Sequence, residues 1–228
     1  MPLNYYFDLM SQPSRAVYMF LNINKVPFVS KPVALRKGEH NGAAFKEINP
    51  FSLVPAIEDD GWCLTESIAI SKYLIQKYGL ADHWFPKDLK RQARVEEYLH
   101  WQHFNTRGIC ASLFQHLLIM PVATGKKSDP AIVENLKVRV KKMVGQLESY
   151  FLKDRAYLAG DEISLADIFG ACELMQLHGC HEDSLFDNSP KVKAWLERVR
   201  AETKPHFDEA HAMIYRARQR FHAVIAKL

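Results

Sequence analysis

The residues most clearly suited to binding or catalysis lie near the N-terminus, in the run Ser11-Gln12-Pro13-Ser14. This run follows an aromatic and apolar stretch and opens a helical pattern, with a polar cap residue and a proline in the first turn. Amide N–H groups and the helix dipole at such a helix start favour an anion. The Ser11 hydroxyl could donate a hydrogen bond to a thiolate and lower the pKa of a bound thiol, or it could only cap the helix.

Two further segments could bind a ligand through their backbone. Val54-Pro55 begins a predicted strand. A cis peptide bond there would turn the backbone of Val54 outward to pair with a peptide-like ligand, whereas a trans proline at a strand edge is the alternative. Ser67 and the amides around Glu66 open the next helix, where they could hold a carboxylate or act only as a cap.

The elements that would position these segments alternate between strand and helix. Aromatic and apolar runs predict strands at residues 3–9 and 27–33, joined by the helix that opens at Ser11 and therefore parallel. Residues 56–58 and 62–64 flank Asp59-Asp60-Gly61, which is a strong hairpin signal, and a helix follows. The order βαβ-ββα predicts a thioredoxin-like domain over residues 1–80, with the candidate segments at one end of its sheet.

Only helical periodicity is visible beyond a linker at residues 81–87, and it predicts an all-helical domain over residues 88–228. Pro121 and Gly125 are expected to end the first helix, and Ser164 and Asp167 have the spacing of a capping box. The expected helices span residues 88–120, 130–153, 164–178, 190–202 and 206–226.

Composition excludes several classes of function. The 228 residues are 48% hydrophobic and 25% charged, as in ordinary globular proteins, and contain neither a membrane-length apolar run nor a secretory signal, so we expect a cytoplasmic protein without membrane contact. The net charge of +4 is spread over interleaved acids and bases, which argues against nucleic-acid binding. The scattered cysteines and histidines predict neither a disulfide nor a metal site. The cysteines are Cys63, Cys110, Cys172 and Cys180.

Residues 8–17 closely resemble the strand-to-helix motif of theta-class glutathione transferases. Thioredoxin relatives that exchange disulfides carry Cys-x-x-Cys at this turn, and Ser11 and Ser14 exclude that chemistry. The resemblance covers nearly the whole chain. It continues at residues 37–40, 48–49, 54–55, 64–70, 82–86, 94–99, 107–108, 157–160 and 165–167.

The resemblance implies an enzyme that adds the thiolate of glutathione to small hydrophobic electrophiles, or that reduces organic hydroperoxides. It implies a thioredoxin-like N-terminal domain, a helical C-terminal domain and a homodimer. Glutathione is the co-substrate, and no cofactor is expected. By motif match, Ser11 would bind the glutathione sulfur, and Arg107 would stabilise the thiolate or a leaving anion.

The remaining glutathione contacts are also implied by motif match. His40 would hold the glycine end of the tripeptide, and Val54, next to a cis Pro55, would pair its backbone with the cysteinyl part. Glu66 and Ser67 would bind the γ-glutamyl group.

The electrophile pocket is expected between the two domains. Its candidate residues on the helical side could equally be ordinary helix–helix core. They are Ile109, Leu113, Phe114 and Leu117. The family pattern is incomplete at Asn41 and Leu53, where some theta enzymes place lysines that assist glutathione, and at Phe104, where some relatives place an acid that reaches across the dimer.

Two other functions stay open at this point. One is a non-catalytic binding or assembly module with the same fold, which the complete serine motif disfavours. The other is a glutathione-dependent dehalogenase or isomerase specialised for one metabolite, which would use the same Ser11.

Overall fold

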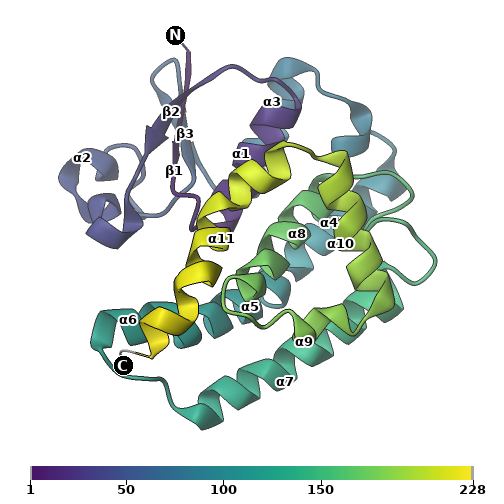
Figure 1. Cartoon of the computed structure of the whole chain (residues 1–228). Helices are drawn as coiled ribbons and strands as arrows, with labels where there is room; N and C mark the ends of the chain where they lie inside the picture. The colour runs from purple at the N-terminus through teal and green to yellow at the C-terminus, as the bar shows by residue number, and fades with distance from the viewer. Residues whose placement is uncertain (1, 227–228) are drawn as a thin grey trace.

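Four strands form one mixed sheet in a computed structural model that describes residues 2–226 (Figure 1). The strand order is β2-β1-β3-β4, with β1 and β2 parallel and the other two pairs antiparallel. The predicted βαβ-ββα arrangement is therefore confirmed. The strands are β1 (Leu3–Phe7), β2 (Phe28–Pro32), β3 (Ala56–Asp59) and β4 (Trp62–Thr65).

Strand β1 places its side chains alternately on the two faces of the sheet. Leu3, Tyr5 and Phe7 are buried in the main hydrophobic core. Asn4 and Tyr6, on the other face, both donate to one carboxylate oxygen of Glu58 at 2.9 Å. The pattern of apolar residues thus fixes the register of the strand, because a shift by one residue would bury Asn4.

Helices cover both faces of the sheet. Helices α1 (Gln12–Ile23) and α3 (Ser67–Tyr78) contact each other and share the main core. On the Tyr6 face, Phe45 of the short helix α2 (Ala43–Lys46) packs with Val33 and Val54. Helix α2 was not predicted, because four residues are too few to show helical periodicity.

The rest of the chain is helical, as predicted. The helices are α4 (Leu89–Trp101), α5 (Thr106–Phe114), α6 (Met120–Thr124), α7 (Pro130–Gln146), α8 (Leu165–His178), α9 (Ser184–Asp187), α10 (Pro190–Glu202) and α11 (His206–Ile225). The predicted helices at 164–178, 190–202 and 206–226 agree with α8, α10 and α11 to within one residue at each end.

The prediction of one unbroken helix at 88–120 is wrong. The chain leaves helical geometry at Asn105 (φ −109°, ψ −93°), whose side-chain amide donates to the Trp101 carbonyl at 2.8 Å. Gly108 permits this break, because a Cβ at that position would lie 2.9 Å from the His103 carbonyl oxygen. Pro121 does not end a helix, because it lies in the first turn of α6. Helix α6 ends at Gly125, whose backbone has left-handed geometry.

Helix α8 is the centre of the helical domain. Every residue from Leu165 to Leu177 is buried, and the helix contacts α1, α4, α5, α10 and α11. Its predicted capping box is present, with the Ser164 N–H donating to Asp167 Oδ2 at 2.8 Å. Because α1 packs directly on α8, the start of α1 is placed by the helical domain as well as by the sheet (Figure 1).

Candidate functional site

Ser11 occupies the N-cap of α1 and is half-exposed. Its Oγ accepts from the Ser14 N–H at 3.4 Å, which is longer than the usual 2.9–3.0 Å of such a bond. The other contact of Oγ, with the Val54 carbonyl oxygen, is also 3.4 Å long. Among residues 2–226 the hydroxyl proton therefore has no strong acceptor, which leaves it available to a ligand.

The Ser11–Val54 contact joins two of the predicted segments across 43 positions of sequence. The Val54-Pro55 bond is cis, one of the two options for this proline. The loop before it is shaped by the buried Asn49, whose side-chain amide donates to the Leu53 carbonyl at 2.7 Å. The backbone of Val54 and the hydroxyl of Ser11 thus lie together at one end of the sheet.

The third predicted segment has unusual backbone geometry. Glu66 stands at the N-cap of α3 with φ 66° and ψ 106°, a region that non-glycine residues rarely occupy. Glu66 is exposed and Ser67 is buried. Backbone strain of this kind is concentrated at ligand sites, so it favours a binding role for this turn over a capping role alone.

His40 lies apart from these contacts, on the short 3₁₀ turn Glu39–Asn41 between β2 and β3. Its Nε2 is 3.3 Å from the Asn41 side-chain amide, and its Nδ1 is buried without a hydrogen-bond partner. Within residues 2–226, His40 makes no hydrogen bond to Ser11 or Val54.

Arg107 lies in the first turn of α5, half-buried. Its charge acts on Glu173, a fully buried acid of α8 whose pKa is raised by burial to about 7 and lowered in part by Arg107, Arg15 and Gln12. Arg107 therefore faces the same buried polar region as Gln12, the residue that follows Ser11. Neither Glu173 nor Arg15 was predicted, since a single charged residue within an apolar helical stretch gives no signal of its partner.

The four candidate pocket residues divide into two groups. Ile109 and Leu113 are buried in the main core. Phe114 belongs to a separate apolar group, here called the Met10 cluster, which includes the residue directly before Ser11, and Leu117 packs against both this group and the main core. Its members are Met10, Phe114, Leu117, Leu118, Cys180, Ala217, Phe221, Val224 and Ile225.

The Met10 cluster contains a contribution from α11 that the sequence analysis missed. Phe221, Val224 and Ile225 have the spacing i, i+3, i+4 of one helix face, which was the available signal. They bring the end of α11 to the apolar side chains next to the Ser11 turn. The apolar groups of this cluster therefore lie beside the turn for which an anion-binding role is predicted.

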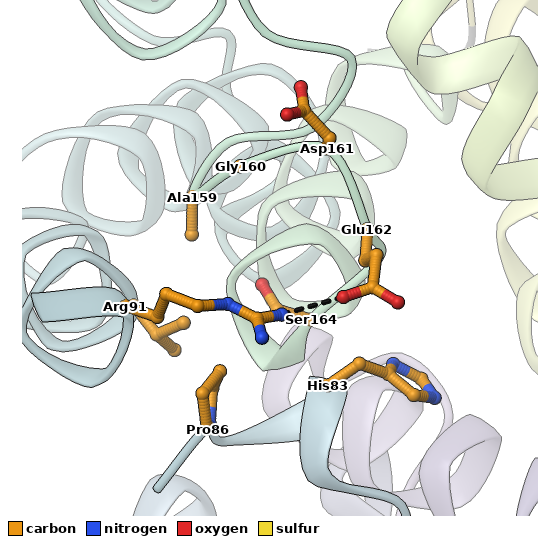
Figure 2. Close-up of a pocket in the computed structure, with 9 residues that line it drawn as sticks. His83, Pro86, Arg91, Ala159, Gly160, Asp161, Glu162 and Ser164 are labelled. Atoms are coloured by element: carbon orange, nitrogen blue, oxygen red, sulfur yellow. Dashed lines mark hydrogen bonds and ion pairs between the residues drawn. The ribbon is translucent and has the colours of Figure 1, made fainter. Parts of the chain in front are cut away.

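A separate cavity of about 280 Å³ lies between the linker, α4 and the loop before α8 (Figure 2). Arg91 and Glu162 are joined there by an ion pair at 2.6 Å, and both are exposed. None of the predicted site residues lines this cavity. The lining residues are His83, Pro86, Arg91, Val95, Ala159, Gly160, Asp161, Glu162 and Ser164.

Comparisons with known proteins identify the family of the chain. The family model for the N-terminal domain of glutathione S-transferase matches residues 1–76, and the model for the C-terminal domain matches residues 111–202. Glutathione S-transferase theta-1 from Bos taurus and that from Rattus norvegicus are each 42% identical to this chain over 221 residues, covering 96% of it and 91% of the relative.

Solved structures of human enzymes are similar over the whole chain. The apo form of human glutathione-S-transferase T1-1 has a TM-score of 0.91 at 39% identity and covers 99% of this chain and 96% of its own. A human theta-class glutathione transferase, in complex with the glutathione conjugate of 1-menaphthyl sulfate, has a TM-score of 0.91 at 34% identity, with coverage of 100% and 98%. Over the described residues, no helix is long and apolar enough to cross a membrane.

Proposed function

The chain belongs to the theta class of glutathione S-transferases, and from that premise we propose that Ser11 activates the thiol of glutathione for attack on small hydrophobic electrophiles. The observation that carries the assignment to Ser11 is its hydroxyl, which stands at a helix start with only two long contacts of 3.4 Å. A sulfur anion placed there would receive a hydrogen bond and the favourable field of the α1 N-terminus.

A lower thiol pKa increases the fraction of glutathione that is present as thiolate at neutral pH. An ordinary thiol has a pKa of about 8.5 and is about 3% ionised at pH 7, whereas at a pKa of about 6.5 it is roughly three-quarters ionised. That shift of about two units corresponds to about 2.7 kcal/mol. Intrinsic nucleophilicity falls as the pKa falls, which offsets about eightfold of the roughly 24-fold gain in thiolate. The net gain of about threefold shows that positioning of the thiolate must supply the larger part of the rate.

The rest of the tripeptide would be held by groups on three loops. The backbone of Val54 would pair with the cysteinyl part, and the turn at Glu66 and Ser67 would bind the γ-glutamyl end. His40 would hold the glycine end, a role that rests on the family motif alone. Glutathione is then the co-substrate, and the reaction requires no further cofactor.

The electrophile would lie against the Met10 cluster, with Arg107 near the developing negative charge. Of the four candidate pocket residues, Phe114 and Leu117 contribute to this cluster, Leu117 while also packing against the main core, whereas Ile109 and Leu113 are buried in that core. The same thiolate would also reduce organic hydroperoxides. Both reactions need an apolar surface for the substrate and an ionised sulfur.

The active form would be a homodimer in the cytoplasm. Three large apolar side chains support an interface, because they remain exposed to solvent: Phe51 at 70%, Leu53 at 60% and Phe104 at 86%. Light scattering of the purified protein should give twice the mass of one chain. Replacing Phe51 and Phe104 with serine should shift the protein toward the monomer.

The test of Ser11 is a titration of the thiolate absorbance of bound glutathione in wild type and in Ser11→Ala. The alanine variant should return the thiol pKa toward its value in free glutathione and lose most conjugation activity. Ser14→Ala is the matched control, because Ser14 lies in the same turn and its Oγ is buried without a hydrogen-bond partner. Full conjugation activity in Ser11→Ala would remove the proposed role.

A further inference from the structure

The turn that carries Ser11 is held by the helical domain through Arg15. This arginine is fully buried on α1. Its Nη1 donates to the carbonyls of Leu9 and Met10 at 3.0 and 3.1 Å, the two residues directly before Ser11. Its Nη2 donates to the Cys172 carbonyl at 2.8 Å and to Gln176 Oε1 at 2.6 Å, both on α8. One guanidinium thus links the Ser11 turn to the central helix of the other domain.

Gln176 completes the link. It is buried, and its Nε2 donates to the Met10 carbonyl at 3.3 Å while its Oε1 accepts from Arg15. The Met10 carbonyl therefore receives donors from both α1 and α8. The N–H groups of the same turn are fixed by Asp8, which accepts from Met10 N at 2.8 Å through its side chain and from Ser11 N at 2.9 Å through its carbonyl.

The charge of this arginine is balanced within the same region. Burial lowers the pKa of Arg15, and nearby Cys172 and Glu173 raise it. Glu173 lies one turn before Gln176 on α8 and faces Arg15, Arg107 and Gln12. Its Oε2 has no hydrogen-bond partner. The four bonds of Arg15 thus go to neutral oxygens, and Glu173, whose pKa of about 7 leaves it partly protonated near neutral pH, supplies only part of a balancing charge.

Stability alone does not account for an arginine here. The neighbouring Ala16, Val17 and Phe20 are fully buried and apolar. Exchanging a buried charged group for apolar residues of similar size is often neutral or stabilising. What Arg15 adds is geometry, because a planar guanidinium can hold several acceptors in fixed positions.

We propose that Arg15 and Gln176 are positioning residues that fix the Ser11 hydroxyl, so that thiolate stabilisation at the sheet depends on a contact with α8. This inference rests on the proposed role of Ser11. Neither residue has to touch glutathione. Their effect would pass through two backbone carbonyls. Arg15 donates to the carbonyls of Leu9 and Met10, and Gln176 donates to that of Met10.

The test is Gln176→Met, which keeps the length of the side chain and removes both hydrogen bonds, beside Gln176→Glu, which keeps an acceptor for Arg15. In Gln176→Met the thiol pKa of bound glutathione should rise by about one unit, a loss that corresponds to tenfold in the ionisation constant. The value of kcat/KM at pH 6.5 should fall about twofold, mainly through kcat, because the thiolate fraction falls about fivefold and the greater intrinsic nucleophilicity of the less acidic thiol offsets about threefold of that loss. Gln176→Glu should recover at least half of the pKa shift.

A merely structural role is excluded by a second variant on the same helix. Leu177→Ala removes buried apolar surface from α8 without touching the Ser11 turn, so it should lower Tm and leave the thiol pKa unchanged. If Gln176→Met behaves like Leu177→Ala, with a lower Tm and the wild-type thiol pKa, the inference is overturned. If Gln176→Met does not fold, Gln176→Asn, which shortens the side chain by one methylene, is titrated instead and is held to the same outcomes.

The titration of Ser11→Ala separates failure of this inference from failure of the proposed function. A pKa shift in Ser11→Ala without one in the Gln176 variants leaves the function standing and removes the positioning role. Absence of a shift in Ser11→Ala itself means that the proposed function has failed first.

Discussion

Helices α1 and α8 both begin with a serine at the N-cap, Ser11 for α1 and Ser164 for α8. Ser164 is buried, and its N–H and Oγ both donate to Asp167 Oδ2, at 2.8 and 2.9 Å. Ser11 is half-exposed, and both contacts of its hydroxyl are 3.4 Å long. Residue type and position are the same, so the difference lies in how far the protein satisfies each hydroxyl. A cap without strong partners is the one that can serve a ligand.

The two regions also differ in their buried acids, which lie six positions apart on α8. Asp167 accepts from Leu158 N, Ser164 N and Trp195 Nε1, each at 2.8 Å. Glu173 has an oxygen without a hydrogen-bond partner and faces the start of α1. Asp167 therefore completes a structural cap, whereas Glu173 adds a partly ionised group near the start of α1.

The largest expected effect belongs to the structural region. Asp167→Ala leaves three buried N–H groups without their acceptor, so we expect a loss of about 3–5 kcal/mol in the free energy of unfolding. This corresponds to a fall in Tm of about 6–20 °C for a chain of this size. Calorimetry measures the loss. In the fraction that stays folded, the thiol pKa of bound glutathione should be that of wild type; a raised pKa would mean that the two regions are not independent.

Ser11→Ala is expected to have the next largest effect, on activity rather than stability. Loss of the hydrogen bond to the sulfur costs about threefold through ionisation, and loss of the positioning that supplies the larger part of the rate should bring the fall in kcat to about 10²-fold, or about 2.7 kcal/mol. Steady-state kinetics with a good electrophile measure it, and Ser14→Ala is the control. A fall in kcat of less than threefold would mean that Ser11, like Ser164, only caps its helix.

Glu173→Gln tests the difference between the two buried acids through the pH dependence of stability. The pKa of Glu173 is about 7 in the folded protein, raised by burial from an ordinary value of 4.5. The folded state therefore binds more protons than the unfolded state between these values, and stability from this group falls as pH rises from 4.5 to 7. The full change is on the order of 3 kcal/mol. Urea unfolding of wild type and Glu173→Gln at pH 5 and pH 7.5 should give unfolding free energies whose difference changes by about 2 kcal/mol, the part of the full change that falls between these two pH values. A constant difference contradicts the prediction.

The fold was predictable wherever the local pattern was long and repeated. The order of elements βαβ-ββα with its parallel first pair of strands, the hairpin at Asp59-Asp60-Gly61 and the capping box at Ser164 all follow from local signals, and the structure confirms them. The break at Asn105 could not be predicted, because it depends on a side-chain bond to Trp101 and on the close approach of Gly108 to His103.

The candidate site was predictable only in part, for a similar reason. The Ser11 turn and the cis Val54-Pro55 bond have local motifs. The contact between Arg15 and Gln176 spans 161 positions and has no local motif, so only the packing of α1 on α8 reveals it. Roles in glutathione binding for His40, Glu66 and Ser67 remain predictions from the family motif.

The smallest expected effect compares the two serines as caps. Ser164→Ala removes an Oγ bonded at 2.9 Å to a buried carboxylate and should cost about 1 kcal/mol or slightly more, within the usual range of about 0.5–2 kcal/mol for cap substitutions. Ser11→Ala should cost a few tenths of a kcal/mol, since a bond of 3.4 Å contributes little to the folded state. Urea unfolding of both variants without glutathione measures the two values. If Ser11→Ala proved as destabilising as Ser164→Ala, the hydroxyl of Ser11 would already be committed to the helix, and the premise that it is free to hold a sulfur anion would fail.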